Sequence, residues 1–497
     1  MDDKRSFQQF LENPKSRYAI LFFWILVFFL LTTMLQLFVP YPIDDDTAYH
    51  FSVGQLIGKY GILHDFPWTP FSWQFDHYAD KEFIFHLLFL PLGGLGFVGA
   101  ARVVGALAGA LILTALYLLL SAEKVRYAGI WTLLPLMCGE FVFRLALVRP
   151  HLLSITLALT IMWAYAQERP RVLLFAAFAY PLSYVAFWQI PLILIVAAES
   201  ARLLAGERLR WKPALIVLGG LSAGVMLHPN TVNLLGINWI HMTDILFQSA
   251  WGRKVEFENI GTEFNPYTLS EWGNSLVLIT VMAGTALVLG WRNRRRDALP
   301  LAFALAALVF CLLTVRTLRF VEYFVPFSVA ALALAARRFD TRLLAPSLLA
   351  VALLYLIAFG TGPFKIIASK TPYLEPSIAR YFEKSIPVDA QVFTCGWDYT
   401  GNLMLALPER RFIVAADPTL FYKKDPNLYS IWRRIPIDAP IDSVEAIRKL
   451  FKSRYVVCRN FEAYWPFFET IEKDPAVKTL FADNKWVFFD LGARSAN

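Results

Sequence analysis

Long apolar runs separated by short polar segments fill most of the chain up to about Gly360, and the first run extends from Ala19 to Val39. Crossing a bilayer takes about 20 mostly apolar residues, because only a helix satisfies every backbone N–H and C=O group inside lipid. A basic stretch precedes the first run, as in a signal peptide, but the run is too long for one and no small-residue cleavage site follows it. The pattern predicts a retained first membrane-spanning helix.

Basic clusters between the apolar runs predict the orientation of the helices, because lysine and arginine concentrate in cytoplasmic loops. If each cluster is cytoplasmic, the chain crosses the membrane about eleven times, with its N-terminus inside and the segment after Phe364 outside. The predicted spans are 19–39, 98–120, 127–141, 152–167, 171–187, 188–205, 213–228, 274–290, 299–315, 320–336 and 343–360. This places two long loops, 40–97 and 229–273, on the outer side.

The pattern changes after residue 361. Residues 362–497 have an ordinary composition, with short alternating runs that predict strands and an amphipathic helix from Ser443 to Phe451. The predicted strands are Gln391 to Thr394, Arg411 to Val414, Arg454 to Cys458 and Trp486 to Phe489. We expect a polytopic α-helical membrane domain, 1–361, followed by a soluble, non-cytoplasmic α/β domain, 362–497.

Composition agrees with a membrane protein, since 57% of the residues are hydrophobic and 17% are charged, against roughly 25% charged in soluble domains. The net charge of +8 follows from the basic inner loops, so no nucleic-acid partner is expected. Cys395 and Cys458 fall in the C-terminal domain, where a disulfide is permitted but spacing alone does not establish one. Without an organellar targeting signal, the expected location is a plasma (inner) membrane with a periplasmic or extracellular C-terminal domain.

Three adjacent carboxylates, Asp44, Asp45 and Asp46, follow the first predicted span. Such a group can hold a hard divalent cation, Mg²⁺ or Mn²⁺, and one member can serve as a general base. The alternative is a solvated acidic turn that caps a helix beginning near Thr47. Glu263, in the second long outer loop, is a further catalytic or metal-binding candidate.

Cationic candidates also lie on the predicted outer side. Arg316 and Arg319 flank a helix start, where arginines commonly reach toward lipid headgroups. A phosphate-bearing ligand would also explain them, through charge-assisted hydrogen bonds. Arg149 and His151 lie in a short loop, and His151 is a candidate metal ligand, proton carrier or structural hydrogen-bonding residue. The spacing of the remaining histidines fits no zinc pattern.

Four short segments follow one another along the chain, each on the predicted outer side. They are Asp46-Thr-Ala-Tyr-His50, Thr262-Glu263 ahead of Pro266, Arg319-Phe320 ahead of Pro326, and Gly396-Trp-Asp-Tyr-Thr-Gly401. In order and placement they resemble motifs of the GT-C membrane glycosyltransferases, specifically of the catalytic subunit of oligosaccharyltransferase.

The resemblance implies roles for these segments. Asp46, with Asp44 or Asp45, would bind metal or orient the acceptor, and Glu263 would complete the site. The donor phosphate would lie near Arg316 and Arg319. By the same resemblance, the residues that seat the acceptor are Trp397, Asp398 and Tyr399.

The chain also departs from the family pattern. Gly396 replaces the first tryptophan of the C-terminal signature, and Thr400 stands before its glycine. Near the place of the family's Asp-x-Asp metal motif, this chain has Arg149-Pro-His151. Metal binding is then weaker, rearranged or absent, with Arg149 and His151 supplying positive charge to the donor phosphate.

We therefore expect an inverting transferase that moves a sugar or glycan from a polyprenyl-phosphate or -pyrophosphate donor to a protein, lipid or glycan acceptor. A second interpretation, a monosaccharide donor on a lipid monophosphate with a lipid or glycan acceptor, fits the missing Asp-x-Asp. An alternative of another class is a non-catalytic subunit or flippase of an envelope-glycan assembly. A transporter would place charges near mid-membrane, whereas the ionisable residues here gather at predicted outer ends.

Overall fold

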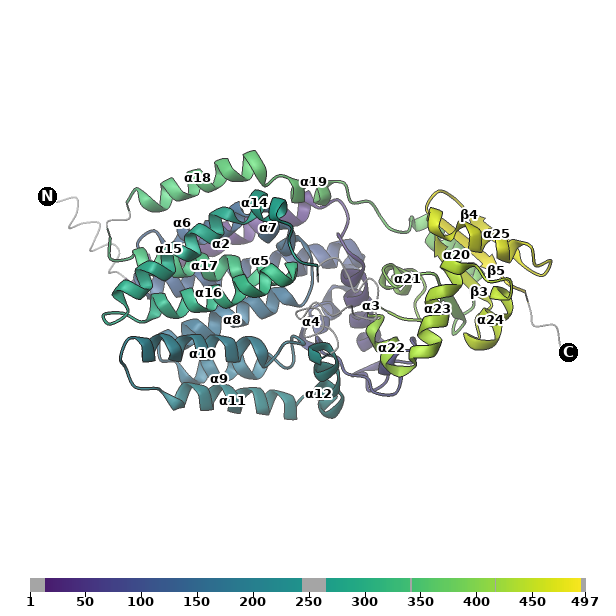
Figure 1. Ribbon diagram of the computed structural model, residues 1–497, viewed down its shortest axis with the longest axis horizontal. Helices are drawn as coiled ribbons and strands as arrows, with labels where there is room; N and C mark the ends of the chain where they lie inside the picture. The colour runs from purple at the N-terminus through teal and green to yellow at the C-terminus, as the bar shows by residue number, and fades with distance from the viewer. Residues whose placement is uncertain (1–13, 244–264, 340–341, 416, 493–497) are drawn as a thin grey trace.

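The computed structural model describes residues 14–243, 265–339, 342–415 and 417–492. A helical bundle forms one end of the molecule and a small α/β domain forms the other (Figure 1). The helices that lie along the bundle are α2 (Pro14–Phe38), α5 (Gly96–Ala122), α6 (Ala128–Leu133), α7 (Gly139–Ala146), α8 (His151–Ala166), α9 (Pro170–Ala179), α10 (Gln189–Leu204), α11 (Trp211–Met226), α15 (Val277–Asn293), α16 (Leu299–Arg316), α17 (Val321–Ala336) and α18 (Leu344–Phe359).

Each predicted span coincides at least in part with helix, but the span count of eleven is not confirmed. Among the described residues, four helices are long and apolar enough to cross a membrane, or up to eight if each sharply bent pair is one span. The predicted span 127–141 is broken, because α6 passes through the 3₁₀ turn η3 (Leu134–Met137) into α7 at a bend of 87°. The predicted span 171–187 is helical only to Ala179, ahead of Pro181, whose ring disfavours a continued helix.

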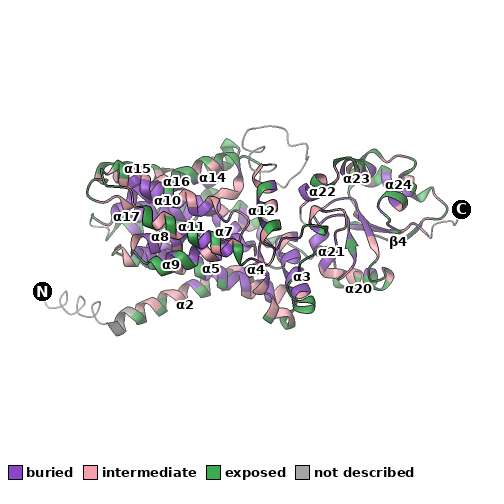
Figure 2. Ribbon diagram, turned by 90° about the horizontal axis from the view of Figure 1, so that it is seen from below, coloured by how far each residue is buried: buried purple, intermediate pink, exposed green. Residues whose placement is uncertain are grey.

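The outside of the bundle is apolar, as a lipid-facing surface requires. Along α2, large side chains such as Phe22 and Met34 are exposed, and Leu354 and Ile357 are exposed on α18. Figure 2 shows exposed and half-buried positions along the outer helices of the bundle, α2 among them, and buried positions in its interior. Contiguous apolar surface of this kind is rare on soluble monomers. The helices and their surface together describe a membrane-embedded, multi-pass protein.

The first long loop folds into short helices between the bundle and the C-terminal domain (Figure 1). These are α3 (Asp45–Tyr60), η1 (Trp73–Phe75), α4 (Phe83–Leu87) and η2 (Leu90–Leu95). The second long loop contributes α12 (Thr231–Ile240) and α14 (Leu269–Ser275). Asp44 caps α3 by accepting a hydrogen bond from the Thr47 amide at 3.3 Å, so the helix-capping interpretation of the acidic turn is correct for this residue.

A five-stranded sheet organises the C-terminal domain, in the order β2-β1-β3-β5-β4. β1 (Gln391–Thr394) pairs in parallel with β2 (Arg411–Phe412) and β3 (Tyr455–Arg459), and β5 (Trp486–Asp490) runs antiparallel to β3 and β4 (Lys478–Ala482). Four strands lie where the alternating runs predicted them. β4 was not predicted, because its side chains are exposed or half-buried and it lacks a strong apolar pattern.

Helices surround this sheet. They are α20 (Pro376–Ser385), α21 (Thr400–Ala406), α22 (Thr419–Lys424), α23 (Pro426–Asp438), α24 (Ser443–Leu450), η7 (Glu462–Tyr464) and α25 (Trp465–Glu472). In contrast, α19 (Gly362–Ala368) lies at the bundle, where Ile367 packs with Val39 and Ala146. The amphipathic pattern predicted α24 correctly to within a residue. A disulfide joins Cys395, just after β1, to Cys458 on β3.

The two faces of the sheet contribute to different cores. One face packs Phe393, Val456 and Phe489 against α23, α24 and α25. The opposite face packs Val457 and Phe488 into a core that also contains aromatic and aliphatic residues of loop 40–97. The first loop and the C-terminal domain therefore share one hydrophobic core.

Candidate functional site

Asp45 joins the first loop to the C-terminal domain. Its carboxylate accepts hydrogen bonds from the Gly401 amide at 2.8 Å, the Asn402 amide at 2.7 Å and the Asn402 side-chain amide at 2.7 Å. These donors lie at the N-terminus of α21, where a carboxylate is favoured by unpaired backbone N–H groups. Burial raises the pKa of Asp45 to about 7, against the lowering effect of the Asn402 and Gly401 amides.

We call this contact the joint: α3 packs on α21, and Asp45 is hydrogen-bonded to Gly401 and Asn402. The tryptophan-aspartate-tyrosine segment, residues 397–399, completes it. A Cβ atom on Gly401 would lie 2.4 Å from the Asp45 carbonyl oxygen, so the close approach requires glycine. Tyr399 is fully buried, and its hydroxyl donates to the Val457 carbonyl at 3.2 Å. In this chain the signature therefore supports a contact between domains.

Asp46, the next residue after Asp45, faces a different environment. Arg149 forms ion pairs with both Asp44, through Nε, and Asp46, through Nη1 at 3.0 Å. The Asp46 side chain is 29% exposed, whereas that of Asp44 is 11% exposed. Arg149 thus brings one positive charge to both Asp44 and Asp46.

Lys81 and Arg319 bring two further cations to this region. Lys81 Nζ lies 3.1 Å from Glu82 Oε1. The positive charge of Arg319 acts to lower the pKa of Lys81. Burial lowers the pKa of Lys81, but the carboxylates of Glu82 and Asp417 outweigh it, so the pKa is raised and the lysine stays charged. We call Asp46, Arg149, Lys81, Glu82 and Arg319 the charged cluster.

Asp417 brings a carboxylate of the C-terminal domain to the cluster, where its charge acts on Lys81. The same carboxylate pairs with His241 Nε2, in the second long loop, at 2.6 Å. Desolvation acts to raise the pKa of Asp417, but the hydrogen bond and charge of His241 outweigh it, and the pKa is lowered. Arg319 itself comes from η6 (Leu318–Phe320), the turn between α16 and α17, and lies 5.7 Å from the centre of the Tyr184 ring. The groups of this polar region thus come from segments that are far apart in the sequence.

His151 and Arg144 lie deeper in the bundle. His151 Nε2 lies 2.9 Å from the Arg144 carbonyl oxygen, which is the structural hydrogen bond foreseen as one of its roles. The charges of Arg149 and Arg319 also act on His151. Arg144 pairs through Nη2 with Glu322 Oε2 at 2.7 Å in a buried position.

Other predicted residues lie less centrally. Arg316, at the end of α16, is exposed, and Asp398 is exposed with Oδ2 at 3.5 Å from Arg459. Trp397 is half-buried against the core between the sheet and α23, α24 and α25. Glu263 lies outside the described residues. The binding and catalytic roles of these residues stay predictions.

Sequence reasoning missed Lys81, Glu82 and Asp417 as members of the site. The available signal was the run Asp80-Lys81-Glu82 between aromatic residues of the first loop, since consecutive charges in an apolar setting commonly have partners. Asp417 had no local signal, because its place beside Lys81 depends on the packing of two distant segments.

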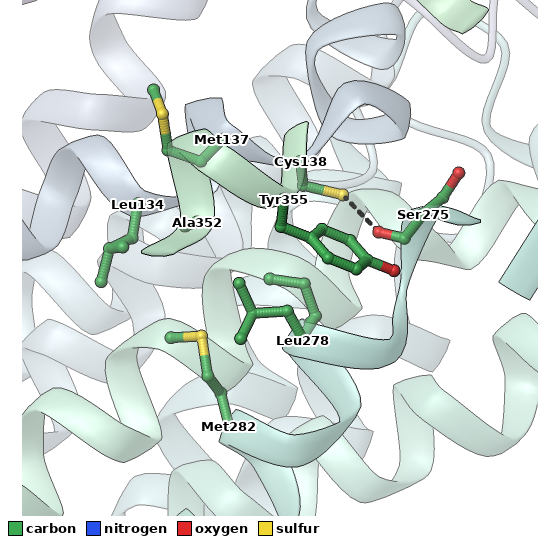
Figure 3. A pocket seen from close by; sticks show the side chains of 9 residues that line it. Leu134, Met137, Cys138, Ser275, Leu278, Met282, Ala352 and Tyr355 are labelled. Atoms are coloured by element: carbon green, nitrogen blue, oxygen red, sulfur yellow. Dashed lines mark hydrogen bonds between the residues drawn. The ribbon is translucent and has the colours of Figure 1, made fainter. Parts of the chain in front are cut away.

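A small apolar cavity lies apart from these residues, between η3, α15 and α18 (Figure 3). Its lining includes Met137, Cys138, Met282 and Tyr355, and Cys138 Sγ contacts the Ser275 carbonyl oxygen at 3.7 Å. The cavity contains no side chain of the charged cluster. We therefore place the candidate site at the end of the bundle next to the C-terminal domain.

Solved structures share the overall fold of this chain, whereas its sequence matches no family model and no curated protein. The apo crystal structure of ArnT from Cupriavidus metallidurans matches with a TM-score of 0.58 and 12% identity, over 97% of this chain and 100% of that chain. ArnT is a GT-C glycosyltransferase. The present chain has the GT-C fold.

A second ArnT structure, bound to undecaprenyl phosphate, matches with a TM-score of 0.60 and 12% identity, over 97% of this chain and 99% of that chain. The fold expected from the sequence motifs is therefore confirmed. The narrower resemblance to oligosaccharyltransferase stays a prediction, because a likeness at this identity establishes the fold and no more.

Proposed function

We propose that this protein is a membrane glycosyltransferase that takes a sugar from a polyprenyl-monophosphate donor and transfers it to a hydroxyl group of a lipid or glycan. The observations that carry the proposal are the electrostatic interaction of Lys81 with Arg319 and the ion pair of Asp46 with Arg149, in a GT-C fold. The ArnT chain with the same fold holds undecaprenyl phosphate.

Lys81 and Arg319 form the proposed phosphate subsite. Like charges repel, and two cations brought together from separate segments are stabilised by an anion between them. Lys81 offers a compact ammonium and Arg319 a planar guanidinium, which together suit a phosphate with one sugar ester and one lipid ester. Glu82 and Tyr184, which contact the two cations, hold them in place.

The reaction needs a leaving group and an acceptor for one proton. The acceptor oxygen attacks the anomeric carbon of the donor sugar, and the bond from that carbon to the phosphate oxygen breaks. Polyprenyl phosphate leaves with the bonding electrons, and Lys81 and Arg319 stabilise the additional charge. The proton of the acceptor hydroxyl passes to Asp46, which its ion pair with Arg149 orients.

No step is assigned to a divalent cation at Asp44 and Asp46, because Arg149 already pairs with both carboxylates. Mg²⁺ or Mn²⁺ bound with the help of Glu263 stays the alternative. Adding EDTA separates the two: activity that is lost and then restored by Mg²⁺ or Mn²⁺ supports the metal-dependent mechanism, and unchanged activity supports the arginine-based one.

A lipid or glycan acceptor is favoured over a protein sequon by the state of the C-terminal signature. Tyr399 is fully buried with its hydroxyl bonded to Val457, so its side chain supports the domain contact. Asp398 is exposed and Trp397 is half-buried, and both remain as residues that can contact an acceptor. A sequon peptide offered with a competent donor is expected to receive no sugar.

The test uses the full-length protein in proteoliposomes with a radiolabelled sugar attached to polyprenyl monophosphate, in parallel with the same sugar on polyprenyl pyrophosphate. Transfer to lipid or glycan is expected from the monophosphate donor alone. Transfer from the pyrophosphate alone would overturn the donor assignment. Absence of transfer from a panel of both donors by a correctly folded protein would favour a non-catalytic subunit.

A further inference from the structure

Two histidines and a glutamate meet inside the first loop, outside the carboxylate triplet. His50 on α3 and His86 on α4 approach through Nδ1 and Nε2 at 2.8 Å, and Glu82 precedes α4. One ligand atom from each of these three residues lies within 4.8 Å of the others. All three residues are buried, at 5%, 1% and 7% exposure for His50, His86 and Glu82.

Asp80 provides a second, independent observation. His86 Nδ1 lies 2.7 Å from Asp80 Oδ1, so the ring is oriented with Nε2 pointing at His50. A carboxylate on the far nitrogen is the usual support for a metal-binding histidine, because it fixes the ring and makes the near nitrogen more basic. The other oxygen, Asp80 Oδ2, is buried and has no hydrogen-bond partner among the described residues.

The charge of this cluster also favours a cation. Asp80 and Glu82 place two carboxylates in a buried region, and Lys81 is the cation between them in the sequence, paired to Glu82. A buried carboxylate is costly without full compensation. Lys81 balances only one of these two negative charges. A divalent ion bound to Glu82 would compensate the other, and it would also stabilise the Asp80 carboxylate, which contacts the His86 ring.

We propose that His50, Glu82 and His86 bind a divalent transition-metal ion, with Zn²⁺ as the reference ion, and that Asp80 positions His86. Two imidazole nitrogens and one carboxylate oxygen are a ligand set that Zn²⁺ accepts, with a fourth position left for water. With the His86 proton on Nδ1 toward Asp80, the proton between the two rings belongs to His50 Nδ1; on metal binding it moves to His50 Nε2, and each of the two facing nitrogens donates a lone pair to the ion. This site differs from the cation predicted at Asp44, Asp46 and Glu263, and it does not depend on the proposed transferase activity.

The position of the site gives the metal a structural consequence. His50 lies on α3, which packs on the C-terminal domain, while His86 lies on α4, next to the bundle. Metal binding would therefore fix the first loop between the two parts of the protein. The bond between the metal ion and Glu82 would also hold the neighbouring Lys81 in its place in the charged cluster.

The experiment measures metal content directly, in full-length protein purified in detergent through an affinity tag that contains no histidine. The protein is stripped with a chelator, reloaded with Zn²⁺ or Co²⁺, desalted and measured by mass spectrometry of the metal, with the visible spectrum of the Co²⁺ form as a second readout. We expect one tightly held ion per chain and a Co²⁺ spectrum typical of nitrogen and oxygen ligands.

Variants assign the ion to this cluster. His50→Ala and His86→Ala are expected to lose the bound metal and the Co²⁺ spectrum, whereas His64→Ala, which changes an exposed histidine of the same loop, keeps both. Wild-type protein that retains no metal after reloading would overturn the proposal even if the variants fail to fold. Equal metal content in wild type and in a folded His86→Ala variant would overturn it as well.

Discussion

The joint and the charged cluster begin at adjacent residues and have opposite properties. Asp45 is buried, and its three hydrogen bonds all come from one helix N-terminus of the C-terminal domain. Asp46 is partly exposed and pairs with the guanidinium group of Arg149. Successive residues at the start of α3 point in different directions, so the same carboxylate serves a domain contact at one position and faces a polar region at the next.

This difference shows that the acidic triplet is not one functional unit. Asp44 caps α3, Asp45 stabilises the joint, and Asp46 belongs to the charged cluster. Substitutions in the joint should therefore alter stability, and substitutions in the charged cluster should alter activity. Each prediction below tests one side of this separation.

The largest effect is expected from Asp46→Asn. Removing the proposed proton acceptor should lower the transfer rate by about 10²–10⁴-fold, which is the usual contribution of a general base. Its thermal unfolding temperature should stay close to that of the wild type. The measurement is sugar transfer in proteoliposomes, with Asp76→Asn as a control, because Asp76 is an exposed acid paired to Lys424. Transfer at the wild-type rate would remove Asp46 from the mechanism.

Lys81→Met should follow, with transfer reduced by about 10²–10³-fold, as for the loss of one group that stabilises a developing charge. Lys81→Arg keeps the positive charge and should recover part of the activity. The matched control is Lys424→Met, which removes an exposed lysine of the C-terminal domain. If Lys81→Met and Lys424→Met transfer sugar equally well, the phosphate does not contact Lys81.

On the joint side, pH should act through Asp45. Burial raises the pKa of Asp45 from 3.8 to about 7, so the folded protein binds a proton that the unfolded chain releases. This contribution to the free energy of unfolding is complete below about pH 4 and is lost as the pH rises through about 7, with a magnitude on the order of a few kcal/mol.

The measurement is the unfolding temperature of detergent-solubilised protein between pH 4 and pH 8. Asp45→Asn should flatten the decline, whereas Glu409→Gln, which breaks an exposed pair with Lys59, should leave it unchanged. An identical decline in wild type and Asp45→Asn would assign the pH dependence to other groups.

The smallest of these effects is expected from Gly401→Ala. The new Cβ would come within 2.4 Å of backbone at Asp45, and relieving this overlap should cost about 1–3 kcal/mol of stability. Gly219→Ala is the control, since a Cβ there meets nothing within 4 Å. Equal unfolding temperatures for the two variants would show that the joint tolerates a wider separation.

Hydropathy and motif order predicted a helical membrane bundle and a C-terminal α/β domain, but the count of eleven spans is not confirmed. The apolar runs located the helices, and four of the five strands followed from alternation. The break at η3 was not predicted, because Pro135 lies inside a continuous apolar run and hydropathy does not register backbone geometry. The motif order indicated the GT-C fold even though individual motifs were weak.

The site was harder to predict, because its groups come from segments that are far apart in sequence. Asp46, Arg149 and Arg319 were identified individually, but the sequence did not show that Arg149 pairs with Asp44 and Asp46. The separation of His50 and His86 by 36 residues likewise fits no short metal motif, and folding alone brings them together.

The core shared by the first loop and the C-terminal sheet has a consequence for biosynthesis. Asp45 and Asn402 are 357 residues apart, and the Phe412 amide donates to the Trp68 carbonyl at 2.7 Å across a similar interval. A ribosome that makes about 5–20 residues per second needs tens of seconds to synthesise the chain between them. During that time Trp68, Phe66 and Tyr78 have no partner sheet, so the apolar face of the first loop stays uncovered until the last strands emerge.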